Sequence, residues 1–326
     1  MTLILDDRTV RSVFDWTSAI DALRAAYAAD PTPARFPDRR IARGDHGWLR
    51  TLSGVPADPA LMGFKAIAAS PRNGRVSYLI SLFDQRTAEL VALLDGHSIT
   101  GYRTAATTAL AAGVLAPDGA LSLAVIGSGF EAKNHVRALA AVRELKSVRV
   151  YSPRAESRTR FVAELSDLPT TIEQSASAEL AVEGATVVLC AARSRDESPT
   201  LRGAWLRPGM TVLSIGSTLP EQREVDVDVI DRADVLAADM LAEVLEETGD
   251  LIAALDAGVD ASGKAVALAD LIGGRSVGRT SGDQILLYKS VGSALQDLAV
   301  ADMCVRAAQE QGLGARFPLE IRAVEK

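Results

Sequence analysis

A glycine-rich turn, GSGFEA at residues 127–132, follows the apolar run LSLAVI at residues 121–126. Between a strand and a helix, Gly127 permits the tight turn, Gly129 lets the backbone approach a pyrophosphate, and Ala132 allows close helix packing. The positive end of the helix then faces the anion. This pattern predicts a dinucleotide site on a parallel sheet. The other predicted contacts from this turn are Ser128, Phe130 and Glu131.

Beyond residue 117 the chain alternates between apolar runs and helical patterns. Such alternation predicts a doubly wound parallel sheet. We expect its strands at residues 121–126, 148–151, 187–191, 211–215 and 235–237. A last helix is expected over about residues 290–310.

The first 116 residues have a different pattern. An extended start at residues 2–5 precedes an amphipathic helix at residues 15–27. Residues 31–47 are rich in Pro and Arg and predict a loop that enters a strand. Apolar runs separated by Gly, Pro and Asp then predict a mixed or antiparallel sheet. These runs are residues 48–52, 63–68, 76–83 and 90–94.

Composition limits the possible partners and compartments. A length of 326 residues favours two domains, and a net charge of −7 leaves no broad basic field for nucleic acid or an anionic membrane. No uncharged apolar run reaches about 18 residues. Cys190 and Cys304 have no metal-like spacing and predict buried thiols in a reducing compartment. We therefore expect a cytoplasmic protein without a metal, a membrane partner or a nucleic-acid partner.

Residues 95–115, DGHSITGYRTAATTALAAGVL, precede the glycine turn. This segment resembles the ornithine cyclodeaminase/mu-crystallin family, whose members carry a matching DG..IT..RTAA segment followed by a strand and a GxGxxA turn. The resemblance implies a Rossmann-type domain at residues 117–299. It also implies a smaller α+β substrate-binding and dimerisation domain, made of residues 1–116 and about 300–326. The last helix returns to that smaller domain, and the partner is a second copy of the chain.

The residues that follow the second parallel strand indicate the type of cofactor. An NAD-selecting enzyme places an acid there to accept from the ribose hydroxyls, whereas this chain has Ser152 and Arg154, followed by Arg158. A hydroxyl and cations suit a 2′-phosphate. We therefore expect NADPH/NADP+ rather than NAD+, with a solvated helix start as the alternative explanation of these arginines.

Further cofactor contacts are expected where parallel strands end, because ligands bind at that edge. By family position, Thr104 and Ser77 contact the nicotinamide end, and Arg103 is a further predicted cofactor contact. The segment Ser290-Val291-Gly292 in LLYKSVGSALQDLA matches a family segment that closes over nicotinamide and substrate. The contacts expected from the strand ends are Ala191, Ala192, Ser214, Ile215 and Gly216.

The resemblance also implies a substrate site built from cations. Lys65 in GFKAIAAS matches the strand lysine of the family, Arg103 matches its carboxylate-holding arginine, and Arg39 fits its PxR position. Lys65 and Arg103 are the predicted catalytic residues. Loop arginines crowd around Arg39, so a solvated role for it is the alternative.

Two positions depart from the ornithine cyclodeaminases. Thr218 stands where those enzymes have an aspartate that handles the amino group, and Arg50 stands where they have a glutamate suited to the ammonium of ornithine. A guanidinium repels a diamine and attracts a carboxylate. Together with Val291, both are predicted to line the substrate site.

The sequence thus predicts an NAD(P)H-dependent oxidoreductase that acts on the C=N or C–N bond of an imino, amino or 2-oxo acid. Ornithine cyclodeaminase, which converts ornithine to proline and ammonia, is the first alternative. The second is a small-ligand binding protein gated by NADPH, as in mu-crystallin. Net NADPH consumption, ammonia release from ornithine, and binding without turnover distinguish the three.

Overall fold

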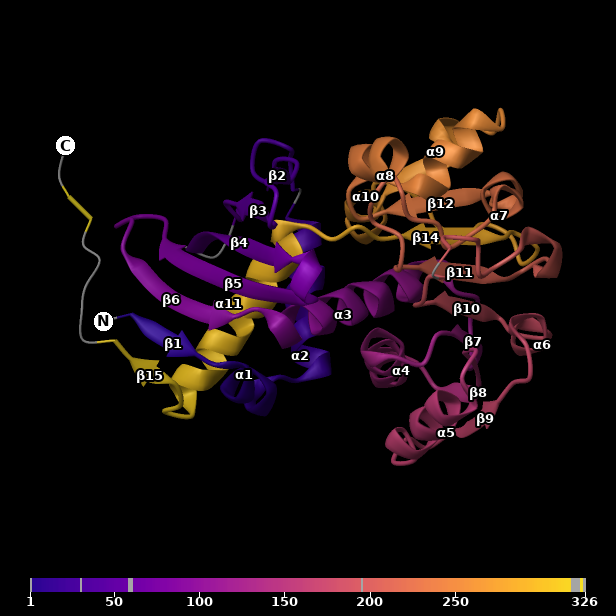
Figure 1. Ribbon diagram of the computed structural model, residues 1–326, viewed down its shortest axis with the longest axis horizontal. Helices are drawn as coiled ribbons and strands as arrows, with labels where there is room; N and C mark the ends of the chain where they lie inside the picture. Colours follow the sequence, from indigo (N-terminus) through magenta and orange to yellow (C-terminus); the bar gives the residue numbers. More distant parts are fainter. Residues whose placement is uncertain (1, 30, 58–60, 195, 318–322, 325–326) are drawn as a thin grey trace. The chain divides into compact units, whose positions relative to one another are not determined.

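The computed structural model describes residues 2–29, 31–57, 61–194, 196–317 and 323–324. The chain forms two compact units: residues 1–103 with 293–326, and residues 104–292 (Figure 1). The division falls inside a helix, earlier than the predicted boundary at residue 116. Part of the predicted first domain, residues 318–322 and 325–326, lies outside the described residues.

The first unit contains a mixed seven-stranded sheet in the order β15-β1-β6-β5-β4-β3-β2. Neighbours from β2 to β6 pair antiparallel, and β1 joins β6 in parallel. The prediction of a mixed or antiparallel sheet is therefore confirmed. The strands are β1 (Leu3–Leu5), β2 (Arg40–Arg43), β3 (Trp48–Gly54), β4 (Leu61–Ser70), β5 (Arg75–Asp84), β6 (Leu90–Asp95) and β15 (Ala315–Arg316).

Helices cover one face of this sheet. The helices of the unit are α1 (Asp7–Val13), α2 (Trp16–Ala28), α11 (Ala294–Glu310) and the start of α3 (His97–Leu115). Helix α2 begins where Asp15 accepts a hydrogen bond from the backbone N–H of Ser18, and its predicted apolar face is buried. A Cβ on Gly63 of β4 would lie 3.1 Å from the Leu298 side chain of α11. The last helix thus packs on the first unit, as the resemblance implied.

Strand β2 and helix α1 of the first unit were not predicted, and neither was the two-residue strand β15. Strand β2 lies inside residues 31–47, where a loop was expected, because its RIAR sequence is almost wholly exposed and lacks an apolar alternation. Its strand conformation comes from pairing with β3. Helix α1 has only seven residues, too few for a clear period.

The second unit contains a parallel eight-stranded sheet in the order β13-β12-β14-β11-β10-β7-β8-β9. Strand order reverses between β7 and β10, which makes their carboxyl ends the topological switch point. The predicted doubly wound sheet is confirmed. The strands are β7 (Leu121–Ile126), β8 (Leu145–Tyr151), β9 (Thr171–Gln174), β10 (Val187–Cys190), β11 (Thr211–Ser214), β12 (Val235–Ala238), β13 (Ala265–Ala267) and β14 (Leu286–Lys289).

The second unit has an apolar core because its parallel strands are buried on both faces. Strands β10, β11 and β14 are buried along their whole length. Its helices are the rest of α3, α4 (Phe130–Val142), α5 (Ala155–Glu164), α6 (Ala178–Val182), α7 (Val227–Arg232), α8 (Leu241–Glu247), α9 (Gly249–Asp256) and α10 (Leu268–Ile272). Such a rigid core fixes the loops at the strand ends.

Two other predictions concern the whole chain. Cys190 and Cys304 are both free and buried, as expected. Among the helices in the described ranges, none has the length and apolar character required to cross a bilayer.

Candidate functional site

A buried ion cluster lies between the sheet and α11 in the first unit. Lys65 projects from β4, is 1 % exposed, and its Nζ lies 2.7 Å from each carboxylate oxygen of Asp297 on α11. Arg103 on α3 places its Nε 3.0 Å from Oδ1 of the same aspartate. One carboxylate therefore holds both predicted catalytic cations.

The cluster continues through one amide and a phenol. The guanidinium of Arg103 donates to Oε1 of Gln296, and Nε2 of Gln296 donates to the Tyr27 hydroxyl at 2.8 Å. All of these side chains are buried. Helix α2, helix α3, helix α11 and strand β4 are thereby tied together by polar contacts, which fix the orientation of the Arg103 guanidinium.

Strand register brings one further arginine to the same side of the sheet. Lys65 pairs with Leu52, and Arg50 lies two residues from Leu52, so Arg50 and Lys65 share a face. Arg50 also lies over the Trp48 ring at 5.3 Å. Arg39 directly precedes β2 and is 8 % exposed. Lys65 and Arg50 are therefore on the helix-covered face and Arg103 is in α3, whereas the strand register does not place Arg39.

Burial sets the protonation of the cluster. Loss of solvent lowers the pKa of Lys65 to about 8; Asp297 opposes this shift, while Arg103 and Arg50 add to it. Three cations with one carboxylate leave a positive excess. A carboxylate ligand would offset that excess, whereas a diamine would increase it.

One predicted contact lies elsewhere. Ser77 pairs with Ala68 on β4, and the alternation along β4 turns Ala68 away from Lys65. Ser77 is exposed on the open face of the sheet. The structure therefore does not group Ser77 with the cation cluster, and its cofactor contact stays a prediction.

The glycine turn of the second unit fits a pyrophosphate. Gly127 has a φ of +118°, and a Cβ there would lie 2.7 Å from the Ala191 carbonyl oxygen. A Cβ on Gly129 would meet nothing within 4 Å, so the backbone is open on the side where a phosphate would approach. Helix α4 begins directly after it at Phe130. Glu131 lies along this helix, with Oε2 3.8 Å from Nδ1 of His135.

The residues predicted to select the cofactor adjoin this turn. Ser128 Oγ donates to Ser152 Oγ at 2.9 Å, which links the turn to the end of β8. Arg158 donates to the carbonyl of Ser152 and lies over the Tyr151 ring. Arg154 is exposed at the N-cap of α5. The structure thus brings the three predicted residues together, with Arg154 the more accessible cation.

A profile of the ornithine cyclodeaminase/mu-crystallin family matches residues 20–312. The chain belongs to this family. The Delta(1)-pyrroline-2-carboxylate reductase of Bacillus cereus is 30 % identical over 327 residues, 97 % of this chain and 99 % of the relative.

Two solved family structures have the same fold. The Delta(1)-pyrroline-2-carboxylate reductase of Thermococcus litoralis, solved with NADH and L-proline, has a TM-score of 0.89 and 26 % identity, covering 97 % of this chain and 100 % of that one. The probable ornithine cyclodeaminase of Bordetella pertussis has a TM-score of 0.84 and 30 % identity, covering 97 % and 100 %.

The family segment Ser290-Val291-Gly292 is fixed by one carboxylate. Asp239 accepts from the Ser290 hydroxyl at 2.7 Å and from the backbone N–H groups of Val291 and Gly292 at 2.9 and 2.8 Å. Thr218 is half-buried in the loop after β11, and its N–H donates to the Gln222 side chain. Thr104 is half-buried on α3, and its carbonyl accepts from the Thr108 hydroxyl.

Several site residues escaped the sequence interpretation. Asp297 and Gln296 are adjacent polar residues in the first turn of α11, between Leu295 and Leu298, and this break in the apolar run was the available signal. Lys289 ends a fully buried strand, a similar signal. The others, Tyr27, Glu224, Asp239 and Asp250, lie in segments whose pattern gives no hint of their partners.

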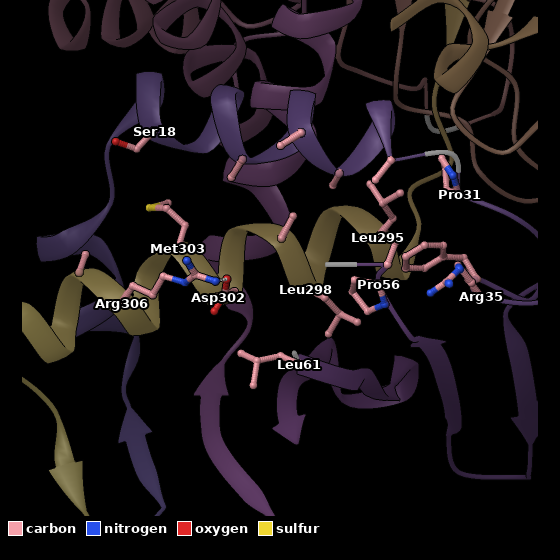
Figure 2. A pocket seen from close by; sticks show the side chains of 18 of the residues that line it. Ser18, Pro31, Arg35, Pro56, Leu61, Leu295, Leu298, Asp302, Met303 and Arg306 are labelled. Atoms are coloured by element: carbon pink, nitrogen blue, oxygen red, sulfur yellow. Dashed lines mark ion pairs between the residues drawn. The ribbon is translucent and has the colours of Figure 1, made fainter. Parts of the chain in front are cut away.

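A separate groove of about 560 Å³ lies between α2 and α11 (Figure 2). Its walls are mainly alanines of α2 and larger apolar side chains such as Leu298 and Met303, and the Asp302–Arg306 ion pair borders it. None of the cluster residues Lys65, Arg103 or Asp297 lines it. This groove is therefore distinct from the cation cluster.

Proposed function

We propose that this protein is an NAD(P)H-dependent oxidoreductase that reduces the C=N bond of an imino acid, or oxidises the corresponding amino acid. The observation that carries the proposal is the Lys65–Asp297–Arg103 cluster: buried, positively charged in excess, and on a family fold. The reductases of Bacillus cereus and Thermococcus litoralis support the reaction class.

The cluster residues have separate roles in this proposal. Arg103 and Arg50 bind the substrate carboxylate, and Asp297 holds Lys65 and Arg103 in place. The Lys65 ammonium has three N–H groups. Two of them suffice for the contacts with the two Asp297 oxygens, and the third donates its proton to the substrate nitrogen. A pKa of about 8 keeps Lys65 protonated near neutrality yet able to give up a proton.

The cofactor is a nicotinamide dinucleotide, which supplies a hydride to the imine carbon. Gly127, Gly129 and the start of α4 would hold its pyrophosphate. Reduction forms a C–H bond from the hydride and an N–H bond from the Lys65 proton, and the dihydronicotinamide is oxidised. NADPH is the proposed form, supported by Ser152 and the accessible Arg154 beside the turn.

Ornithine cyclodeamination is the alternative, favoured by the fold match to the Bordetella pertussis protein. Arg50 argues against cyclodeamination. Its guanidinium is close enough to Lys65 to lower the pKa of that lysine, and it would repel the second ammonium group of a diamine, which needs an acidic side chain there. Thr218 likewise offers no carboxylate for deamination.

A second copy of the chain is the proposed partner. The open sheet face of the first unit carries Leu49 and Leu79, which are 45 % and 44 % exposed. Buried free thiols also suit the proposed cytoplasmic location. Light scattering should give a dimer mass, and Leu79→Asp should give a monomer; a monomeric parent protein would contradict the proposal.

The test of function is a substrate panel with purified protein. NADPH and NADH oxidation are followed with Δ1-pyrroline-2-carboxylate, Δ1-piperideine-2-carboxylate, and pyruvate plus ammonia, beside ammonia release from ornithine. We expect cofactor oxidation with at least one imine and no ammonia from ornithine. Ammonia release without net cofactor change would instead establish the cyclodeaminase, and binding without turnover would establish a ligand-binding protein.

A further inference from the structure

A buried carboxylate in the second unit joins two loops at the sheet edge. Glu224 accepts from the backbone N–H of Ala192, which follows β10, at 3.2 Å. Its other oxygen accepts from the Ser214 hydroxyl at 2.6 Å and from the N–H of Gly216 at 2.9 Å. The residue itself is fully buried. One side chain therefore sets the spacing between the ends of β10 and β11.

The same carboxylate is linked to the glycine turn through packing. Gly127 lies so close to Ala191 and Ala192 that a Cβ would approach their atoms to 3.0 Å or less. Gly216 in turn leaves room for Glu224, because a Cβ there would lie 2.3 Å from its Oε1. The ends of β7, β10 and β11, which form the switch-point edge, are thus held in one arrangement.

Charged neighbours hold Glu224 in position. Lys289 on β14 donates to Ser214 at 2.9 Å and to Asp250 on α9 at 2.8 Å. Asp250 also accepts from the N–H of Glu224 at 2.8 Å, and Arg223 lies 3.5 Å from this aspartate. Among the described residues, the Cys190 thiol of β10 is a further titratable group close to Glu224, and burial first, then Glu224, raises its pKa.

We propose that Glu224 is a positioning residue for the nicotinamide cofactor: its ionised carboxylate holds the loops after β10 and β11 in the arrangement that receives the dinucleotide. This inference rests on the proposed cofactor site. The three donors leave a lone-pair position on Oε1, and a proton bound there would remove the negative charge that strengthens all three hydrogen bonds. Protonation of Glu224 should therefore loosen the loops.

Glu224 takes up its proton within a pH range that can be tested with the folded protein. Burial raises the pKa of Glu224 to about 7, against the opposing effects of Lys289, Ser214 and Gly216. The ionised form dominates above that pH and is lost as the pH falls through it. Cofactor affinity should accordingly weaken as the solution becomes acidic.

The experiment measures dissociation constants of NAD+ and NADP+ by calorimetry, from about one unit below to one unit above pH 7. NAD+ has no 2′-phosphate, so its pH dependence reports on the protein. We expect binding of both to weaken by up to about tenfold at the acid end in the parent protein. We expect Glu224→Gln to bind about 10- to 100-fold more weakly and with a flat pH profile, because its NH2 group opposes one set of donors.

Asp234→Asn is the matched control. Asp234 also accepts a backbone N–H, that of Ile285, but lies at the start of β12, away from the carboxyl ends of the strands. We expect its affinity and pH profile to equal those of the parent. Hydrogen exchange at Ala192 and Gly216 should be faster in Glu224→Gln and unchanged in the control.

The outcomes separate the two proposals. If the parent protein binds neither dinucleotide at any pH, the cofactor assignment fails. If it binds NAD+ with an affinity that does not change with pH, the Glu224 proposal fails while the cofactor assignment stands, even if Glu224→Gln does not fold. A folded Glu224→Gln with the affinity of the parent would overturn it as well.

Discussion

Each unit of the molecule contains a buried ion cluster, and the two clusters differ in charge. The cluster of the first unit has Lys65, Arg103 and Arg50 near a single carboxylate, Asp297. In the second unit, two cations, Lys289 and Arg223, accompany two carboxylates, Glu224 and Asp250, whose oxygens also accept backbone N–H groups. An excess of cations suits an anionic ligand, whereas balanced charges that bind the backbone suit a scaffold. Both clusters are buried, so their net charge is what distinguishes the proposed substrate site in the first unit from the structural cluster in the second.

Removal of the lysine from the first cluster should have the largest effect. Lys65→Met keeps the length of the side chain but abolishes the proton source, so kcat/KM with the best imine should fall about 1000-fold. Cofactor affinity should not change. Lys264→Met, at a lysine that donates to backbone carbonyls of Ile230 and Asp231, is the control. Near-parental turnover in Lys65→Met would rule out Lys65 as the proton donor.

Removal of the shared carboxylate should alter the pH dependence as well as the rate. Lys65 acts as an ammonium, so the kcat/KM of the parent should decline above about pH 8. Asp297 raises the pKa of Lys65, and Asp297→Asn should therefore move that decline to lower pH and reduce kcat about 100-fold. Asp302→Asn, on the same helix and paired with Arg306, should leave the profile in place. An unmoved decline in Asp297→Asn would mean that Lys65 is not the titrating group.

A methyl group in the glycine turn should separate binding from stability. Gly129→Ala adds a Cβ where no protein atom lies within 4 Å, so the melting temperature should be unchanged. Dinucleotide affinity should nevertheless fall about 10-fold or more, because the methyl group occupies the proposed pyrophosphate position. Gly113→Ala, whose Cβ is also unobstructed, is the control for affinity; its melting temperature should rise, because Ala replaces Gly inside α3. Unchanged affinity in Gly129→Ala would place the pyrophosphate elsewhere.

Loss of the accessible arginine should produce the smallest effect. Arg154→Ala should reduce the preference for NADPH over NADH about 10-fold, as judged by the ratio of kcat/KM values. Arg158→Ala should have a weaker effect, because that guanidinium already binds the carbonyl of Ser152 and the Tyr151 ring. An equal loss of kcat/KM with NADPH and with NADH would show that Arg154 does not bind the 2′-phosphate.

The sequence predicted those features whose signal is local. The glycine turn, the alternation of parallel strands and the helix at residues 15–27 each depend on neighbours in the chain, and the structure has all three. The family segment led to Lys65 and Arg103 in the same way. Asp297 was out of reach because its partner Lys65 lies 232 residues away. Long-range pairs of this kind arise from tertiary packing, and a local sequence pattern carries no information about them.

Strand faces were equally hard to predict. Ser77 and Lys65 lie on neighbouring strands, yet only the β4–β5 register shows that they point to opposite faces. A one-residue change of register would reverse the result. Strand β2 illustrates the same point, since its pairing with β3, not its composition, makes it a strand.

The chain crosses between the two units at Arg103–Thr104 and again at Gly292–Ser293. Both crossings fall inside segments that carry proposed functional residues: Arg103 itself at the first, and Asp239-bound Gly292 followed closely by Asp297 at the second. The units are therefore poor modules for recombination. A chimera between two family members that is cut at either crossing would take neighbouring residues of one such segment from different parents. Productive exchange requires that residues 95–104 and 290–297 come from the same parent.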